Sequence, residues 1–131
     1  MTVSIDFDGV IHGYSQGYGD GSVYDPPVEG AAQFIFDCLM VKGWSVFVMS
    51  TREPDQIKEW MENTLFEGKE MPFKITILSS KARFWNAKKN IGITNRKIAA
   101  HVYIDDRGMR FEGSFEGMLE QLEVMKTWQG K

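Results

Sequence analysis

The chain has 131 residues, of which 43% are hydrophobic and 25% charged, and its formal net charge is −3. This length and composition favour one soluble globular domain, and the small excess of acid argues against capture of nucleic acid by overall positive charge. No apolar run reaches the length of a membrane span and no basic, apolar leader precedes the first predicted strand, so we expect a cytoplasmic protein without membrane association. The single cysteine, Cys38, lies in an apolar segment and is expected in the core.

Residues 3–11 begin as an alternating, strand-forming run and end in two aspartates and a glycine. Asp6 and Asp8 are two positions apart, so on a regular strand their carboxylates would share a face and repel each other unless a cation lay between them. Gly9 allows a sharp turn and the close approach of another group. Solvated acids at an exposed strand end are the simpler alternative, which only the rest of the chain can decide.

Residues 12–27 form a loop rich in glycine, tyrosine and serine that directly follows the two aspartates. The segment is too polar and glycine-broken for a regular element, so it is expected either to fold over the aspartates as a flap or to be a plain surface loop. In the flap interpretation, Tyr14, Tyr18 and Tyr24 supply aromatic or hydroxyl contacts to a ligand.

A helix and a second strand come next. Residues 28–42 carry apolar side chains at helical spacing, and residues 44–49 are a nearly continuous apolar run, typical of a strand buried on both faces. Two strands joined by a helix are expected to be parallel, with a right-handed crossover. The polar triplet Ser50-Thr51-Arg52 after the second strand is therefore expected beside Asp6 and Asp8, at the edge where open α/β sheets bind ligands.

The middle of the chain predicts a helix from Pro54 or Asp55 to Leu65 and a third strand over residues 73–78. Residues 81–89 are basic with interleaved aromatics and predict a further helix, capped by one of the two preceding serines. This segment suits an anionic, ring-bearing ligand such as a nucleotide, but a solvated helix with an apolar seam explains the same residues and is the favoured interpretation.

Residues 91–100 are predicted to be a connector that carries Arg96 and Lys97. Residues 101–108 then show the same pattern as residues 3–11: a short strand-forming run is followed by two acids, Asp105 and Asp106, and soon after by a glycine.

Apolar residues between Phe115 and Met125 predict a closing helix, with Ser114 as its cap. Residues 127–131 are expected to form a loose tail. The chain shows no internal repeat and no linker, so residues 1–131 are expected to form a single domain.

The predicted strand ends bring Asp6, Asp8, Asp105 and Asp106 to one edge of the sheet. Four carboxylates without a counterion would be forced to protonate in part, and a divalent cation removes that cost. Oxygen ligands of this kind suit Mg²⁺, which keeps several waters and often shares a substrate phosphate. The acids therefore predict a magnesium site next to a phosphate.

The same edge offers the groups that phosphoryl transfer needs. A carboxylate near the metal can attack a phosphoryl group in line, and a second aspartate can protonate the leaving oxygen and later activate water. Ser50 and Lys97 are the natural pair for holding the transferring phosphoryl oxygens.

In these motifs the chain resembles the haloacid dehalogenase-like superfamily. Its phosphatases carry Asp-x-Asp-Gly-[Thr/Val] after the first strand, Ser or Thr after the second, Lys before the fourth and an acidic pair at the end of the fourth. The matching residues here are Asp6-Phe7-Asp8-Gly9-Val10, Ser50, Lys97 and Asp105-Asp106, in the same order along nearly the whole chain. The last motif, Ile-Asp-Asp-Arg, is similar to that of small phage and bacterial members and of the phosphatase domain of phage polynucleotide kinase.

The resemblance implies a Rossmann-like three-layer α/β/α sandwich with a mainly parallel central sheet. It implies Asp6 as the nucleophile that forms an aspartyl-phosphate and Asp8 as general acid/base. Mg²⁺ would be held by the Asp6 carboxylate, the Asp8 backbone carbonyl and an acid of the Asp105-Asp106 pair. Contacts to phosphate or substrate are expected from Gly9, Ser50, Thr51, Arg52 and Lys97.

Two departures from the superfamily pattern limit this assignment. The lysine of the superfamily is often followed by proline, whereas Lys97 precedes Ile98, so Arg96 and Lys81 stay open as alternatives. The chain also has no room for a folded cap domain, and by family analogy capless members accept large substrates or the ends of polymers.

The side chains next to these motifs have two possible roles each. His12 is expected to be a hydrogen-bonded structural histidine rather than a substrate contact, and His101 is given no chemistry. Arg52 and Arg107 each follow a motif directly, so they are expected either to pair with the aspartates or to meet a substrate anion.

The expected function is Mg²⁺-dependent hydrolysis of a phosphomonoester, with a nucleotide, a sugar phosphate or a nucleic-acid end as the phosphorylated partner. A catalytically silent metal- or phosphate-binding module of the same fold is the second hypothesis, and a phosphorelay receiver domain is the third. Asp8 favours the hydrolase, because a pure binder needs no proton donor at that position. The residues after the second strand disfavour the receiver domain.

Overall fold

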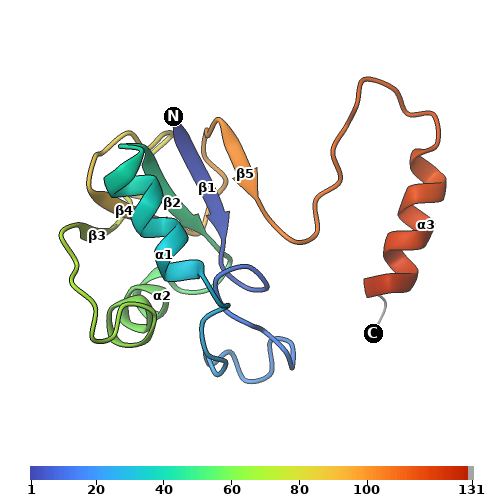
Figure 1. Cartoon of the computed structure of the whole chain (residues 1–131). Helices are drawn as coiled ribbons and strands as arrows, with labels where there is room; N and C mark the ends of the chain where they lie inside the picture. Colours follow the sequence, from blue (N-terminus) through green and yellow to red (C-terminus); the bar gives the residue numbers. More distant parts are fainter. Residues whose placement is uncertain (130–131) are drawn as a thin grey trace.

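The structure is a computed structural model that describes residues 1–129. In this part of the chain, five parallel strands form one sheet in the order β3-β4-β2-β1-β5 (Figure 1). The strands are β1 (Thr2–Asp6), β2 (Ser45–Met49), β3 (Lys74–Ile77), β4 (Asn90–Thr94) and β5 (Val102–Ile104). The predicted mixed α/β fold with a parallel sheet is confirmed.

The register of the sheet brings three strand ends level. Asp6 pairs with Met49, the last residue of β2, and the residue before Asp6 pairs with the last residue of β5. Ser50 and Asp105 follow these two strands directly and therefore start at the level of Asp6. The predicted meeting of these strand ends at the carboxyl edge of the sheet is confirmed.

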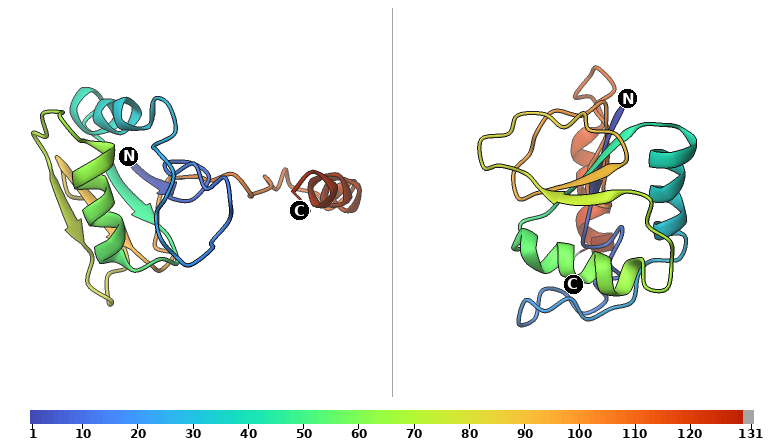
Figure 2. Two further views of the ribbon diagram at one scale, coloured as in Figure 1. Left: turned by 90° about the horizontal axis from the view of Figure 1, so that it is seen from below. Right: turned by 90° about the vertical axis from the view of Figure 1, so that its left-hand side faces the viewer.

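Two helices cover one face of the sheet (Figure 2). Helix α1 (Ala31–Phe36) continues into the π-helical segment η1 (Asp37–Val41), and α2 (Pro54–Trp60) continues into η2 (Met61–Leu65). The first of these helices begins at residue 31 rather than 28, because Gly30 has a left-handed backbone with φ 86°. Between the helices and the sheet lies a core of buried apolar side chains that includes Val3, Ile5, Phe7, Val48, Ile57 and Ile93.

The opposite face of the sheet carries no helix among the described residues, so the predicted three-layer arrangement and the helix over residues 81–89 are both wrong. Residues 79–89 instead run in an irregular, largely extended path over β4. The indole of Trp85 lies so close to Gly92 that a Cβ at Gly92 would be 2.9 Å from it, and its Nε1 donates a hydrogen bond to Asn90 O (3.1 Å). This packing outweighs the helical preference of the segment.

The predicted connector over residues 91–100 is also wrong in its first half, because strand β4 occupies Asn90–Thr94. Ile91 and Ile93 are fully buried in this strand. Gly92 between them interrupts the apolar run, which is why the pattern did not indicate a strand. The missing side chain at this position makes room for Trp85.

The closing helix is confirmed as α3 (Met118–Gln129), and it stands apart from the sheet and the two other helices (Figures 1 and 2). The tail predicted to be loose is helical as far as Gln129, which corrects the prediction for residues 127–129. Residues 130–131 lie outside the described part of the chain. None of the helices that the structure describes combines the length and apolar character that crossing a membrane requires.

Candidate functional site

The carboxyl ends of the central strands surround an open cavity of about 380 Å³. The residues that line it come from five separate segments: Asp6, Asp8, Tyr14, Met49, Ser50, Thr51, Asn95, Lys97 and Arg107. Five of the predicted site residues therefore share this cavity, although the first and the last of them, Asp6 and Lys97, lie 91 positions apart in the sequence. Asn95 was missed because it follows β4, the strand that the sequence did not indicate.

Asp6 is the last residue of β1 and is half-buried at the cavity. Burial raises the pKa of its carboxyl group from 3.8 to about 6, although a hydrogen bond from the Phe7 backbone N–H (2.9 Å) opposes the shift. The charges of Asp106, Asp105 and Asp8 raise the pKa further. Asp6 is therefore a carboxylate whose charge is costly unless a cation compensates it.

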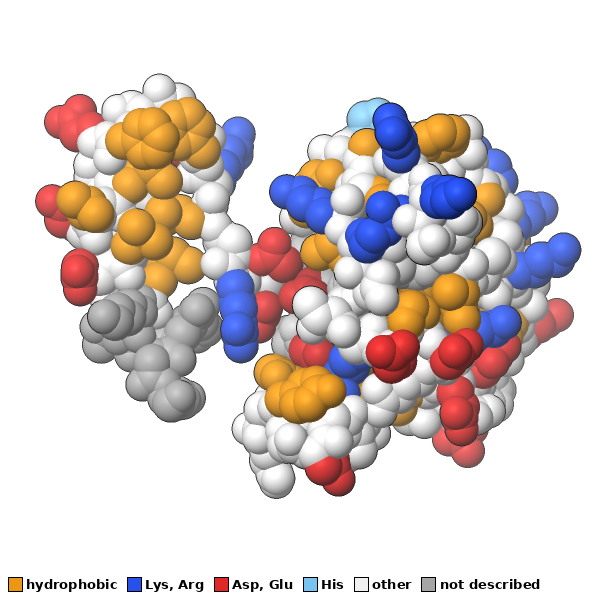
Figure 3. All heavy atoms as spheres, turned by 180° about the vertical axis from the view of Figure 1, so that it is seen from behind, with side chains coloured by type: hydrophobic (Ala, Val, Ile, Leu, Met, Phe, Trp, Pro, Cys, Tyr) orange, Lys and Arg blue, Asp and Glu red, His pale blue; other side chains and the backbone are white. Residues whose placement is uncertain are grey.

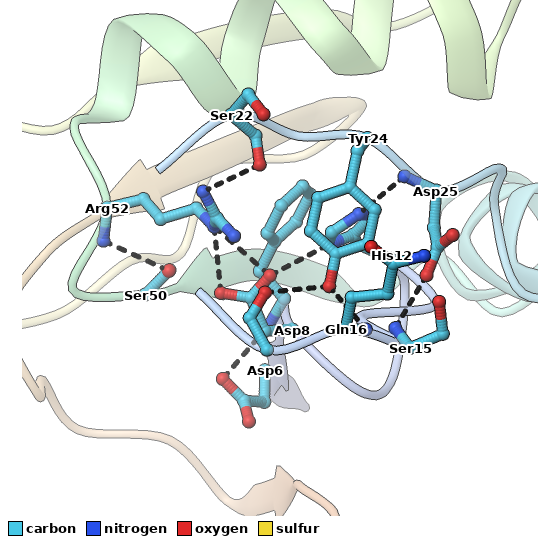
Figure 4. A network of polar contacts seen from close by, with 12 residues as sticks. Asp6, Asp8, His12, Ser15, Gln16, Ser22, Tyr24, Asp25, Ser50 and Arg52 are labelled. Carbon is cyan, nitrogen blue, oxygen red and sulfur yellow. Dashed lines mark hydrogen bonds and ion pairs between the residues drawn. The ribbon is translucent and has the colours of Figure 1, made fainter. Parts of the chain in front are cut away.

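The side chain of Asp8 lies in a different environment from that of Asp6. Because β1 ends at Asp6, the alternation of a regular strand does not extend to Asp8, and the two carboxylates lie on different sides of the chain (Figure 4). Asp8 receives a hydrogen bond from Arg52 Nε at 2.8 Å to one oxygen and 3.1 Å to the other. His12 Nδ1 lies 2.8 Å from the same carboxylate. The expectation of a shared face is wrong, and Asp8 is clamped by two side chains.

His12 is completely buried, and its hydrogen bonds define one tautomer of the ring. Its Nε2 accepts a hydrogen bond from the Asp25 backbone N–H (3.0 Å), so the ring proton lies on Nδ1 and is donated to Asp8. The ring also stacks on Phe7, with centroids 5.5 Å apart. These contacts agree with the prediction of a hydrogen-bonded structural histidine.

Arg52 connects the flap segment, residues 12–27, to the carboxyl edge of the sheet. Its guanidinium is 2% exposed and donates from Nη1 to the carbonyl of Gly21 (2.5 Å) in addition to binding Asp8. The rings of Tyr14 and Tyr18 lie 5.8 and 5.2 Å from its central carbon. The flap segment is therefore held over Asp8 by a buried cation, as the flap interpretation predicted, and Arg52 pairs with an aspartate.

Ser50 and Lys97 reach the cavity from β2 and from the segment after β4. The Ser50 backbone N–H donates to Thr94 O (3.1 Å), and its hydroxyl oxygen accepts from the Arg52 backbone N–H (3.1 Å). The Lys97 ammonium lies 5.0 Å from the centre of the Tyr103 ring. Arg96 donates to Ala82 O (2.7 Å) and does not line the cavity, whereas Lys97 shares the cavity with Asp6.

The acidic pair after β5 meets the first motif at Gly9. This glycine has φ 86°, and a Cβ at its position would overlap the Asp106 carboxylate. Asp105 has a different environment, because its Oδ1 accepts hydrogen bonds from the backbone N–H groups of Arg107 (2.8 Å) and Gly108 (2.5 Å). Asp106 is therefore the acid of the pair that packs against the first motif, and Asp105 caps the turn that leaves β5.

The donor set suits a hard cation, since it consists of oxygen ligands whose mutual repulsion already raises the pKa of Asp6. Within residues 1–129, however, no three His, Cys, Asp or Glu side chains are grouped as a metal site. The ligand set implied by the resemblance requires only two side-chain carboxylates, together with the Asp8 backbone carbonyl and water.

Comparison of the chain with protein-family models, with curated proteins and with solved structures found no match. The resemblance to the haloacid dehalogenase-like superfamily therefore rests on the four motifs alone. Three of them contribute residues to the cavity, and the acidic pair of the fourth lies close enough to Asp6 for its charges to raise the pKa of Asp6, which burial raises most.

Proposed function

We propose that this chain is a phosphomonoester hydrolase of the haloacid dehalogenase type. The observation that carries the proposal is the pairing of a half-buried, charge-crowded Asp6 with Ser50 and Lys97 in one open cavity. A carboxylate at the end of a strand, opposite an ammonium and a hydroxyl, is the arrangement that nucleophilic attack on a phosphoryl group requires.

In the proposed reaction, an oxygen of Asp6 attacks phosphorus in line with the bond to the leaving oxygen. The P–O bond to the leaving group breaks, Asp8 supplies the proton to that oxygen, and Asp6 carries the phosphoryl group as an aspartyl-phosphate. Asp8 then takes a proton from water, which attacks the same phosphorus and releases inorganic phosphate and the free carboxylate. Ser50 and Lys97 hold the phosphoryl oxygens during both steps.

Mg²⁺ is the proposed cofactor. The residues that would hold it are Asp6 and Asp106 through their carboxylates and Asp8 through its backbone carbonyl, together with water. Asp106 is preferred to Asp105, because Asp105 is engaged in the turn after β5 while Asp106 packs against Gly9. The bound cation would offset the repulsion between Asp6 and the phosphate and would lower the pKa of Asp6.

The substrate class stays open between nucleotides, sugar phosphates and phosphorylated nucleic-acid ends. The cavity is open, and Tyr14 and Arg107 at its rim offer an aromatic face and a positive charge to the part of the substrate beyond the phosphate. Both features are compatible with a leaving group larger than a sugar.

A catalytically silent metal- or phosphate-binding module is the second candidate, and the clamp on Asp8 favours it. The Arg52 guanidinium and the His12 N–H both bind the Asp8 carboxylate, whereas a general acid has to present that group to the leaving oxygen. The hydrolase therefore requires that Asp8 is released from at least one of these contacts when the substrate binds.

One experiment separates the two candidates. Phosphate release is measured over a panel of nucleotides, sugar phosphates and 5′- or 3′-phosphorylated oligonucleotides, with Mg²⁺ or with EDTA. The wild type is compared with Asp6→Asn and with Glu62→Gln, an exposed acid in η2 that serves as a matched control. A hydrolase loses at least about 10³-fold in kcat/KM with Asp6→Asn or EDTA and nothing with Glu62→Gln.

Turnover that survives both EDTA and Asp6→Asn would contradict the proposed mechanism. Binding of phosphate with no release from any compound of the panel would favour the silent module.

A further inference from the structure

The helical layer over the sheet is incomplete at the β5 edge. A helix is about 10 Å wide and neighbouring strands are about 4.8 Å apart, so one helix covers roughly two strands. Helix α2 packs on β3 and β4, and η1 packs on β2. No third helix of the described chain lies beside α1 over β5, and the apolar surface there is left open.

This open surface is an apolar groove of about 320 Å³ between α1 and the β1–β5 pair. Its lining includes Ile5, Val10, Ile11, Phe34, Ile35 and Ile104, and Glu29 is the only charged residue that lines it. Phe34, which belongs to α1, is 47% exposed at the groove. An apolar surface of this kind beside an edge strand is typical of a docking site.

Helix α3 presents the complementary surface. Residues 108–110 of the preceding segment lie across an open pocket from the side of the helix that carries Gln121 and Val124. Leu119 and Leu122 project from the other side at helical spacing, continued by Phe115 in the preceding turn, and Phe115 and Leu119 are 79% and 76% exposed. In the view from behind, hydrophobic side chains gather in a patch on the part of the chain that stands apart from the sheet (Figure 3).

A helix of 12 residues is marginally stable in water when its apolar face has no partner. Residues 1–129 therefore include an apolar groove that no helix covers and a helix whose apolar face has no groove. The backbone N–H groups of Arg107 and Gly108 bind the Asp105 carboxylate, and this turn begins the segment that leads α3 away from its own groove. The helix is thus placed for a neighbouring molecule.

We propose that α3 of one copy of this chain occupies the apolar groove of a second copy, and that the reciprocal exchange closes a two-fold dimer. Exchange of the same element between two copies satisfies both surfaces at once. A helix of 12 residues is about 18 Å long and about 10 Å wide. The dimer contains two such helix–groove contacts, and each buries area on the helix and on the groove, so the total buried area is on the order of 1,000 Å². This area is about the lower limit for specific interfaces between proteins.

The test measures the mass of the full chain in solution by sedimentation equilibrium over a wide range of protein concentration. The wild type is compared with Leu119→Glu on the exposed face of α3 and with Phe34→Glu at the groove. Gln121→Glu adds the same charge to the opposite side of α3 and is the matched control. We expect a dimer for the wild type and Gln121→Glu, and a dissociation constant raised at least about tenfold by each of the other two changes.

A mixture of Leu119→Glu and Phe34→Glu chains provides a second measurement. One partner keeps an intact groove and the other an intact α3, so one of the two contacts can form, and the mixture is expected to associate more tightly than either variant alone. Circular dichroism of each variant checks that the sheet is folded.

Three outcomes would overturn the proposal. The first is a monomeric wild type at all concentrations, which would mean that α3 docks on its own chain or nowhere. The second is a dimer that Phe34→Glu leaves intact, which would mean that α3 pairs with something other than the groove. The third is a mixture that associates no more tightly than its components.

Discussion

Arg52 Nε binds both carboxylate oxygens of Asp8, at 2.8 and 3.1 Å, from a position that is 2% exposed. The Asp8 side chain itself is 20% exposed, so the pair lies at the boundary between the core and the cavity. The same guanidinium donates to the carbonyl of Gly21, which ties the flap segment to the pair. The flap, the second strand and the first motif are thus joined by one side chain.

Arg52→Met keeps most of the volume of the side chain and removes its charge and donors. We expect a loss of about 3 kcal/mol in the free energy of unfolding, because Asp8 loses its buried counter-ion and the Gly21 carbonyl loses its charged donor. Urea denaturation monitored by fluorescence measures the loss. Arg83→Met, at an exposed position in the segment after β3, is the control and is expected to change stability by less than about 0.5 kcal/mol. Equal losses in the two variants would show that the clamp is not structural.

The raised pKa of Asp6 predicts a specific pH dependence of stability. The pKa of Asp6 is about 6 in the folded protein, and 3.8 is its reference value in the unfolded chain. Between pH 3.8 and about 6, the folded state therefore binds more protons than the unfolded state. The stability contributed by protonated Asp6 is therefore present below about pH 4 and lost as the pH rises to about 6.

Asp6→Asn removes this titration, which makes the difference between variant and wild type the quantity to measure. In EDTA, we expect the Tm of Asp6→Asn to exceed that of the wild type above pH 6 and the difference to shrink towards pH 4. Thermal melts across this range measure it. A difference that is constant with pH would mean that the Asp6 carboxyl does not titrate with a raised pKa.

Mg²⁺ is expected to stabilise the wild-type chain, because it offsets the repulsion among the acids at the cavity. At ten times its dissociation constant, a ligand that binds only the folded state adds about 1.4 kcal/mol, which corresponds to several degrees in Tm. Asp6→Asn should lose this stabilisation, whereas Glu62→Gln should keep it. The same shift produced by KCl at equal ionic strength would indicate screening rather than a site.

Gly9→Ala tests the contact between the first motif and Asp106. Alanine at φ 86° is strained, and its methyl group would displace the Asp106 carboxylate, so we expect a loss of about 3 kcal/mol. Gly19→Ala is the matched control, because Gly19 has φ 56° but no atom within 4 Å of the added carbon. The control should lose only about 1 kcal/mol, from backbone strain alone. Denaturation by urea measures both losses, and equal values would mean that Asp106 does not pack against Gly9 in solution.

Local patterns in the sequence were sufficient for most of the fold. Strands β1, β2, β3 and β5 and the three helices all coincide with periodic apolar runs bounded by glycine, proline or aspartate. Parallel order followed from the helical connection between β1 and β2, and with it the meeting of Asp6, Ser50 and Asp105 at one edge. These features depend on spacing within a segment and on general rules of connection, which a sequence displays directly.

Strand β4 and the path of residues 79–89 were decided by contacts between distant positions. In the sequence alone, Gly92 indicates a break in a strand and residues 81–89 indicate a helix. Both predictions are wrong because Trp85 packs against Gly92 and donates a hydrogen bond to Asn90 O. The covering of the second face of the sheet therefore depends on the shape of two residues that are not neighbours.

By itself, the sequence predicted five residues that line the cavity, because each of them ends a strand or lies close behind one: Asp6, Asp8, Ser50, Thr51 and Lys97. Gly9, Arg52, Asp105 and Asp106 were predicted at the same site and are not among the residues that line the cavity. Only the tertiary structure decided how they are held there. It binds Asp8 to Arg52 and His12, packs Asp106 against Gly9, and half-buries Asp6. It also leaves the apolar face of α3 without a partner among residues 1–129. The physical reason is that hydrogen bonds, desolvation and packing depend on distances across the fold, which spacing along the chain does not specify.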